Sequence, residues 1–130
     1  MCATFLTSTP KLGQPPPSIL CVDDSRETLE ISRIILEAAG YQVFTTTNSA
    51  AALGLLQTHP INAVVIDVMM PGMSGTELAR EIKHTAANVR VVVYSGSLRG
   101  DESFPFVDAC LSKGSGPLAL RKLIGLLLQK

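Results

Sequence analysis

The sequence predicts one α/β domain built around a doubly wound parallel sheet, and three observations support that prediction. The chain has 130 residues, which is enough for one buried core and too few for two. Hydrophobic residues make up 46% of the chain and charged residues 17%, as in chains that fold. Short runs that are apolar throughout alternate with segments of helical period, which is the pattern of a parallel sheet covered by helices on both faces.

The first unit begins after a Pro-rich segment. We expect residues 1–17 to form a flexible tail and residues 18–130 to form the domain. Residues 18–22 are apolar and predict a strand that stops at two acids. After these acids in the sequence, four apolar residues have the spacing of one helix face, and Gly40 marks the end of that helix. These four residues are Ile31, Ile34, Ile35 and Ala38.

Two further units repeat the order of strand and helix. Residues 41–46 are β-branched and aromatic and predict the second strand, and Asn48 is a suitable N-cap for a helix that ends before Pro60. Residues 61–69 predict a third, nearly continuous apolar strand. Turn residues then lead to a third helix, whose apolar face is formed by Leu78, Ala79 and Ile82.

The last part of the chain contains two more strands and one clear helix. The strands are predicted over residues 89–94 and 107–111, and Pro117 opens a helix with a leucine-rich face. Between the two strands, residues 96–105 contain two glycines and a proline. We therefore expect the fourth helix to be shortened or irregular.

Composition and charge exclude several function classes. Lys and Arg total 11, the same as Asp and Glu, so the chain lacks the positive charge that attracts nucleic acid, and we expect no direct nucleic-acid binding. The apolar runs are shorter than the roughly 20 residues that cross a bilayer, and no signal peptide precedes them. We expect a cytoplasmic protein with no membrane contact. The scattered cysteines Cys2, Cys21 and Cys110 predict neither a disulfide framework nor a structural metal site.

Polar side chains stand where the predicted strands end. Asp23 and Asp24 follow the first strand, Asp67 ends the third, Ser95 follows the fourth and Lys113 follows the fifth. Because ligands of open α/β sheets bind at the carboxyl ends of the strands, we expect these side chains to form one site. Three carboxylates would raise one another's pKa unless a cation joined them. Mg²⁺ fits this set and a phosphate, so the sequence predicts phosphoryl transfer, in which a carboxylate can be the nucleophile.

Four motifs at these strand ends resemble those of a known family. They are Cys21-Val22-Asp23-Asp24, Asp67-Val68-Met69-Met70-Pro71-Gly72-Met73-Ser74-Gly75, Val93-Tyr94-Ser95-Gly96 and Leu111-Ser112-Lys113. In this order they resemble the CheY-like receiver domains of two-component response regulators. The resemblance covers residues 18–130 and implies a flavodoxin-like (βα)5 fold with strand order 2-1-3-4-5.

The resemblance also implies a role for each residue of the phosphoryl site. Asp67 would be the phosphoacceptor, taking a phosphoryl group from the phosphohistidine of a sensor histidine kinase or phosphotransfer protein. Ser95 would bond a phosphoryl oxygen in the active state. Lys113 would pair with the phosphoryl group or, before transfer, with Asp67. The domain would thus be a phosphoacceptor that signals through protein–protein interaction, and not an enzyme in the ordinary sense.

A second set of residues would hold the metal ion in the receiver family. Asp24 would ligate Mg²⁺ directly, and Asp23 would hold it directly or through water. Asp67 and the backbone carbonyl of Met69 would complete the protein ligands. The predicted cofactor is therefore Mg²⁺.

The chain departs from the family pattern at two positions. Cys110 stands where many receivers carry Tyr or Phe three residues before the lysine, and Gly114 stands where a proline commonly follows it. The usual swing of an aromatic ring is not available to Cys110. We therefore expect switching to run through the loop over residues 97–104.

Two other functions remain open on the sequence. One is a receiver-like scaffold that is not phosphorylated and only binds partners, which the missing aromatic and the irregular fourth helix favour. The other is a magnesium-dependent aspartyl-phosphate phosphatase of the haloacid-dehalogenase type, which has Asp-x-Asp after its first strand where this chain has adjacent acids. A dinucleotide-binding domain would need a Gly-x-Gly-x-x-Gly motif after a strand, and none is present.

The end of the chain bears on its partners. The last helix ends at the final residue, so we expect a receiver that stands alone and acts on a separate output protein, with a segment of a longer protein as the alternative. Leu126 and Leu128 lie off the apolar stripe of that helix. We expect them to leave an apolar surface for a homodimer or for docking, on the face formed by the fourth helix, the fifth strand and the last helix.

Overall fold

A computed structural model describes residues 15–69, 74–96, 98 and 104–129. Most of the expected tail over residues 1–17 lies outside this part of the chain. The loop over residues 97–104, where we expect switching, also lies largely outside it.

Five parallel strands form one sheet in the order β2-β1-β3-β4-β5, as the sequence predicts. Among the described residues between β4 and β5 there are turns and no helix, in agreement with a reduced fourth helix. A short 3₁₀ helix, η2, joins β5 to the last helix. In chain order the elements are β1 (Ser18–Val22), α1 (Arg26–Ala38), β2 (Gln42–Thr46), α2 (Ser49–Thr58), β3 (Ala63–Ile66), α3 (Gly75–Thr85), β4 (Arg90–Ser95), β5 (Ala109–Ser112), η2 (Lys113–Ser115) and α4 (Pro117–Leu128).

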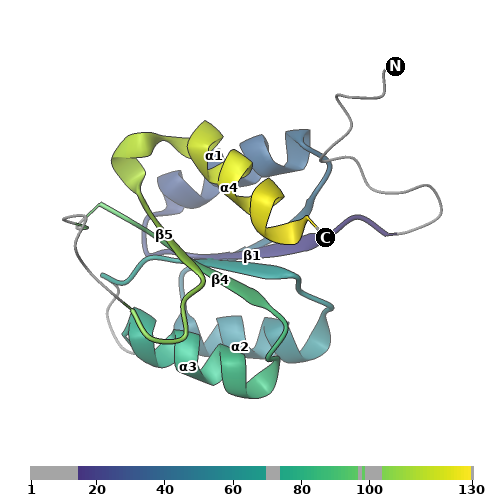
Figure 1. The fold of residues 1–130 in the computed structure, drawn as a ribbon, viewed down its shortest axis with the longest axis vertical. Coiled ribbons are helices and arrows are strands. Elements are labelled where there is room, and N and C mark those ends of the chain that lie inside the picture. The colour runs from purple at the N-terminus through teal and green to yellow at the C-terminus, as the bar shows by residue number, and fades with distance from the viewer. Residues whose placement is uncertain (1–14, 70–73, 97, 99–103, 130) are drawn as a thin grey trace.

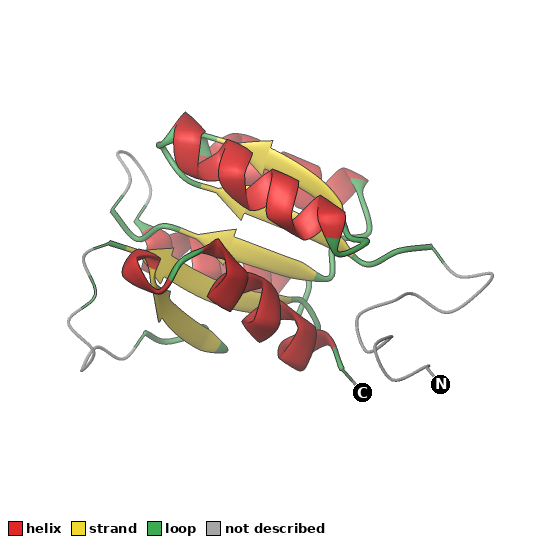
Figure 2. Cartoon of the chain, turned by 90° about the horizontal axis from the view of Figure 1, so that it is seen from above, coloured by secondary structure: helices red, strands yellow, loops and turns green. Residues whose placement is uncertain are grey.

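Helices cover both faces of the sheet (Figures 1 and 2). Consecutive strand residues point to opposite faces, so Leu20 packs in a core cluster beneath α2 and α3, while Ile19 packs in a second cluster beneath α1 and α4. The three central strands β1, β3 and β4 are buried almost throughout, which explains why their sequences are apolar without alternation.

Local sequence sets where most helices begin. Asn48 caps α2, as predicted, and Ser74 and Glu77 form a capping box at the start of α3. Before α4 the chain passes through Gly116 at φ +91°, a left-handed conformation that glycine adopts without strain. Pro117 then occupies the first turn of α4, where its missing N–H costs nothing.

The predicted first helix is present as α1, and the apolar stripe from which it was predicted lies mainly on its outer face, away from the sheet. Ile31 is 46% exposed and Ile34 is 53% exposed. Ala38 is exposed as well, and Ile35 is half-buried. The stripe therefore leaves a row of apolar side chains on the outer surface of α1.

A different stripe of α1 packs against the sheet. Its buried residues are Leu29, Ser32 and Leu36. Both stripes have helical spacing, so periodicity alone could not choose between them. Packing onto the sheet distinguishes the two stripes, while the start of the helix is fixed locally: the N–H of Ser25 donates to Asp23 Oδ1 at 2.9 Å, and Ser25 caps the helix.

Two predicted strands are cut short at an aspartate, β3 at its end and β5 at its start. β3 ends at Ile66, because the chain turns after Asp67. β5 begins at Ala109, because Asp108 lies in the turn before it and accepts the N–H of Val91 on its side chain at 2.8 Å.

The surface expected on the last helix is present in part. Leu126 is 60% exposed, but Leu128 packs against the core beneath α1 and α4. Leu118, one residue after the proline, is exposed on α4 as well.

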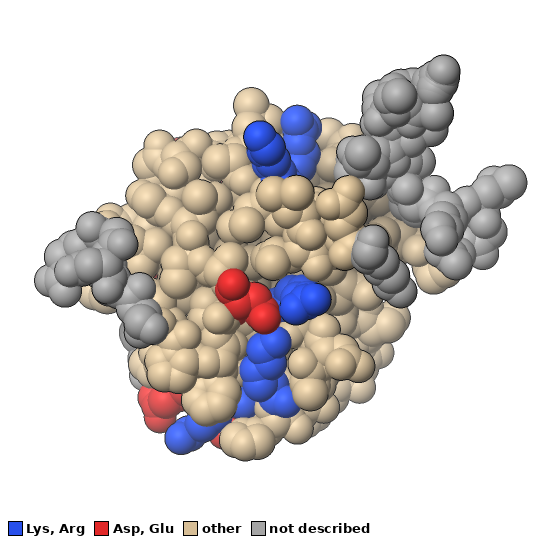
Figure 3. Space-filling model, viewed as in Figure 1, with Lys and Arg blue, Asp and Glu red and all other residues tan. Residues whose placement is uncertain are grey.

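The described residues contain no helix that is long and apolar enough to span a membrane. On the face viewed in Figure 3, Lys and Arg side chains lie in small groups, some of them beside acidic ones, and form no continuous basic surface.

Candidate functional site

The sheet register places Asp23 and Asp67 side by side. Val22 of β1 is paired with Ile66 of β3, and the N–H of Asp67 donates to the carbonyl oxygen of Val22 at 3.0 Å. The residue that follows each paired position is an aspartate, and both project on the α1–α4 face where the two strands end. Asp23 and Asp67 are both buried, so both carboxylates need polar partners.

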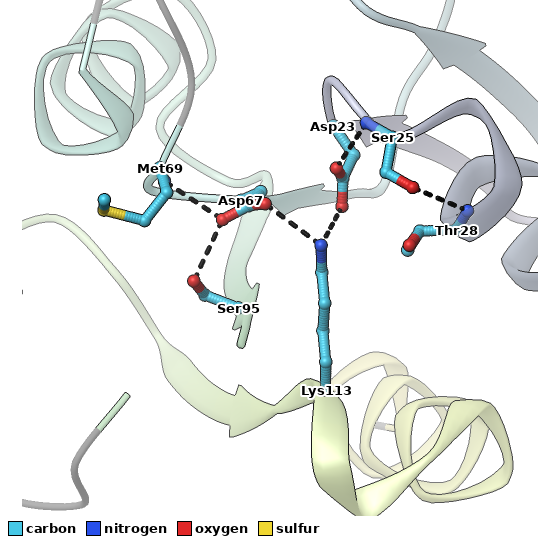
Figure 4. Close-up of polar contacts among 7 residues, drawn as sticks. All are labelled: Asp23, Ser25, Thr28, Asp67, Met69, Ser95 and Lys113. Carbon is cyan, nitrogen blue, oxygen red and sulfur yellow. Dashed lines mark hydrogen bonds and ion pairs between the residues drawn. The ribbon is translucent and has the colours of Figure 1, made fainter. Parts of the chain in front are cut away.

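Asp67 has three such partners (Figure 4). Its Oδ1 accepts hydrogen bonds from Ser95 Oγ at 2.9 Å and from the backbone N–H of Met69 at 3.0 Å. Its Oδ2 accepts one from Lys113 Nζ at 3.0 Å. Three donors from different segments therefore fix the orientation of this carboxylate.

Lys113 bridges the two buried carboxylates. Its Nζ lies 2.8 Å from Asp23 Oδ2 and 3.0 Å from Asp67 Oδ2. Burial by itself would lower the pKa of Lys113, but the hydrogen bonds to the two aspartates outweigh burial and raise it. For Asp23 the balance differs: burial raises its pKa, and the hydrogen bonds from Lys113 and from the N–H of Ser25 offset this only in part.

A third carboxylate completes an acidic cluster. Asp24 is exposed next to Asp23, and carboxylate oxygens of Asp23, Asp24 and Asp67 all lie within 4.8 Å of one another. Three acids face one lysine, so negative charge remains in excess. Oxygen ligands from carboxylates are the ones that a hard divalent ion such as Mg²⁺ prefers.

The predicted site residues thus come together at one edge of the sheet. The structure groups Asp23, Asp24, Asp67, Ser95 and Lys113, as their positions at the predicted strand ends indicate. Met69 is placed next to them by its N–H bond to Asp67, whereas the role of its carbonyl oxygen as a metal ligand stays a prediction.

Two neighbours of the site were not singled out by the sequence. Gly75 opens α3 so close to the loop after Asp67 that a Cβ atom there would lie 2.7 Å from the Cα of Val68. Tyr94 lines a small cavity together with Asp23 and Asp67. The glycine at the end of the third-strand motif could have indicated the close approach at Gly75. The position of Tyr94 just before Ser95 could have indicated that Tyr94 lies near the site.

The match to a family model agrees with this geometry. The model of the response regulator receiver domain family matches residues 19–114. The virulence sensor protein BvgS of Bordetella pertussis is 33% identical over 131 residues, which covers 92% of this chain and 11% of BvgS. The chain spans a third or less of the length of the first curated relatives it matches.

Solved structures show the same fold. The response regulator TrrA of Thermotoga maritima in complex with Mg²⁺ and BeF has a TM-score of 0.79 and 28% identity, covering 86% of this chain and 99% of TrrA. TrrA in complex with the histidine kinase ThkA gives a TM-score of 0.79 at 25% identity, covering 87% of this chain and 99% of that one.

Proposed function

Because the chain belongs to the response regulator receiver domain family, we propose that Asp67 accepts a phosphoryl group from the phosphohistidine of a sensor histidine kinase or phosphotransfer protein. One observation carries this proposal: Asp67 is 6% exposed at the end of a buried strand, and donors from three other positions are aimed at its carboxylate. A purely structural aspartate does not need two further carboxylates beside it.

The transfer uses the groups that already surround Asp67. A carboxylate oxygen of Asp67 attacks the phosphorus, the O–P bond forms as the N–P bond of the phosphohistidine breaks, and the imidazole nitrogen keeps the electron pair. The hydroxyl of Ser95 and the ammonium group of Lys113 lie within hydrogen-bond distance of Asp67. They are the donors for the oxygens of the incoming group.

The acidic cluster fits the metal ion that such a transfer needs. Asp23, Asp24 and Asp67 would hold Mg²⁺, with the carbonyl oxygen of Met69 as a further ligand. When bound, the ion would neutralise charge on the phosphoryl oxygens. The excess of acid over Lys113 supports this assignment, because one lysine leaves two carboxylates uncompensated.

The outer face of α1 suggests where the phosphodonor docks. Ile31 and Ile34 are exposed on a helix that begins at Arg26, three residues after Asp23. A partner that presents its phosphohistidine to Asp67 passes along this surface, and burial of two isoleucines would contribute binding free energy. The kinase complex of TrrA shows that a fold of this kind binds a histidine kinase.

A scaffold that only binds partners is the second candidate. The observation that favours it is the exposed Cys110 in β5, which leaves no aromatic ring at that position. The family match favours a receiver over a phosphatase of the haloacid-dehalogenase type.

Intact-mass spectrometry after incubation with acetyl phosphate and Mg²⁺ separates the two candidates. We expect one phosphoryl adduct on the wild-type protein and none on Asp67→Asn. Asp108→Asn is the matched control, because Asp108 also pairs with a lysine but lies at the other edge of the sheet, and it should keep the adduct. A wild-type protein that takes no phosphoryl group under these conditions would identify the scaffold.

A further inference from the structure

Tyr94 stands beside the phosphoacceptor in the sheet. β3 and β4 are paired with Ile66 opposite Val93, so the next residues, Asp67 and Tyr94, are neighbours on the same face. On its other side Tyr94 is paired with Leu111 of β5. Tyr94 is only 5% exposed, so an aromatic ring forms part of the wall of the site on the α1–α4 face.

The same ring belongs to the core that supports α4. Tyr94 lies in one cluster with Leu120 and Ile124, the two fully buried residues of that helix. Interiors are packed closely enough that a shift of one buried side chain is felt by its neighbours. A change at Asp67 that moves Tyr94 therefore acts on the packing of α4.

The ring has free space on the side of the site. A cavity of about 10 Å³ lies between the sheet and α1, and its lining includes Asp23, Asp67, Thr28, Ser32 and Tyr94. A volume of this size holds about one water molecule when polar groups surround it. The wall of the site can thus adjust there, while Tyr94 also packs in the core cluster that contains Leu120 and Ile124.

A second connection runs along the backbone from the site to the same helix. Lys113, which bridges Asp23 and Asp67, is the first residue of η2, and α4 begins at Pro117. Gly116 between them has φ +91° and provides a point at which the helix can pivot. A group added to Asp67 must re-pair Lys113, which pulls on the start of α4 while Tyr94 supports its middle.

We propose that Tyr94 couples the occupancy of Asp67 to the position of α4, an inference that rests on Asp67 being the phosphoacceptor. Cys110 cannot take this part, because it is exposed in β5 and the ring beside Asp67 comes from β4. α4 also presents Leu118 and Leu126 to the exterior. A change in its position thus alters an apolar surface that a partner can read.

The composition of the chain makes Tyr94 directly observable. There are two tyrosines and no tryptophan, so in Tyr41→Phe the ultraviolet emission arises from Tyr94 alone. The reciprocal Tyr94→Phe protein reports Tyr41, which is buried in the same cluster and lies beside Gly125 of α4. On addition of Mg²⁺ and beryllofluoride, a phosphoryl mimic, we expect the emission of Tyr94 to change because this residue lines the cavity beside Asp67, and that of Tyr41 to change because α4 moves.

Hydrogen exchange tests the coupling itself. Bound beryllofluoride is followed by its ¹⁹F NMR signal, and exchange of the amides in α4 is measured with and without it. In the wild-type and Tyr94→Phe proteins, which keep the ring, we expect binding to change these exchange rates about fivefold or more. In Tyr94→Leu the ¹⁹F signal should remain while the change in the middle of α4, around Leu120 and Ile124, falls below about twofold.

The outcomes separate this inference from the proposed function. If no ¹⁹F signal of bound beryllofluoride forms in the wild-type protein, the phosphoacceptor assignment fails and the coupling fails with it. If the signal forms but the emission of Tyr94 stays constant, or α4 responds equally in Tyr94→Leu, the coupling alone is overturned. The emission measurement keeps Tyr94 in place, so a constant emission overturns the coupling even if Tyr94→Leu does not fold.

Discussion

Two clusters of charged residues lie at opposite ends of the parallel strands, one at their amino ends (the amino edge) and one at their carboxyl ends (the carboxyl edge). Each cluster contains a lysine paired with a half-buried or buried aspartate, but the two clusters differ in charge balance. At the amino edge, Lys83 Nζ lies 2.9 Å from Asp108 Oδ2 and donates to the carbonyl oxygen of Val89 at 2.7 Å. The same Asp108 oxygen accepts the N–H of Val91, and Arg90 lies 3.6 Å from the other oxygen. Every charge in this cluster has an opposite partner within the described residues.

At the carboxyl edge, three carboxylates cluster among the described residues, and Lys113 pairs with two of them, Asp23 and Asp67. The aspartate pKa values shift in opposite directions. Burial acts to raise the pKa of Asp108, but bonds from Lys83 and Val91 outweigh burial and lower it. Burial raises the pKa of Asp23 despite the bond from Lys113. An ion pair alone therefore does not mark a functional site, whereas clustered carboxylates that outnumber their cation do.

Magnesium should separate the two edges most clearly. We expect Mg²⁺ to raise the melting temperature of the wild-type protein and of Asp108→Ala, because an ion that binds only the folded state stabilises it by mass action. Asp24→Ala should lose that rise entirely, since it removes an exposed ligand of the cluster. Thermal melts with Mg²⁺ and with EDTA measure the effect. An equal rise in Asp24→Ala would move the ion away from the carboxyl edge.

Removing the lysine at each edge should have different consequences. Lys83→Met leaves Asp108 without its main partner and should lower the free energy of unfolding by about 2 kcal/mol. Lys113→Met removes a positive charge from the acidic cluster, and Mg²⁺ should then bind about tenfold more tightly. Urea unfolding and Mg²⁺ titration followed by tyrosine emission give the two values. Weaker Mg²⁺ binding in Lys113→Met would show that the lysine organises the ligands.

The pH dependence of stability should have opposite signs at the two edges. The pKa of Asp108 is lowered by folding, so its carboxylate stabilises the protein above the unfolded value of about 4 and the contribution is lost as pH falls through the folded pKa. The pKa of Asp23 is raised by folding, so the folded state favours the neutral carboxyl group. This contribution to stability is present at low pH and is lost as pH rises through the folded pKa.

Two isosteric variants measure this difference. At pH 7 Asp108→Asn should be less stable than wild type, and Asp23→Asn should be more stable by on the order of 1 kcal/mol. The Asp23→Asn difference should shrink as pH approaches 4, whereas the Asp108→Asn difference should shrink only as pH falls below about 4. Urea unfolding across this pH range gives the curves, and two differences of the same sign would contradict the contrast between the edges.

A smaller effect is expected from backbone strain at the amino edge. Phe106, two residues before Asp108, has φ +68°, which is unfavourable for a bulky side chain. Phe106→Gly should relieve strain and raise the free energy of unfolding by about 0.5 kcal/mol. Phe106→Ala removes the ring but keeps the strain, so it should be less stable than Phe106→Gly. Equal stabilities of these two variants would locate the effect in the ring, which lies near His84.

The sequence predicts much of the site because of how parallel sheets are built. A polar residue that ends a buried run is visible in the chain, and carboxyl ends of parallel strands meet at one edge. That argument found Asp23, Asp67, Ser95 and Lys113 without coordinates. The resemblance implied the pair of Lys113 with Asp67, but not the second contact of Lys113 with Asp23, because that bridge depends on side-chain geometry across three strands.

What the sequence determined by itself was therefore local order: apolar runs, helical periods, caps, and acids at strand ends, which together specify the α/β sheet. The tertiary structure decided which stripe of α1 is buried, because two stripes satisfied the same period and only packing onto the sheet distinguishes them. It also decided that Tyr94 lies beside Asp67. Register pairs residues far apart in the chain, and the free energy that selects it comes from long-range contacts that no single segment contains.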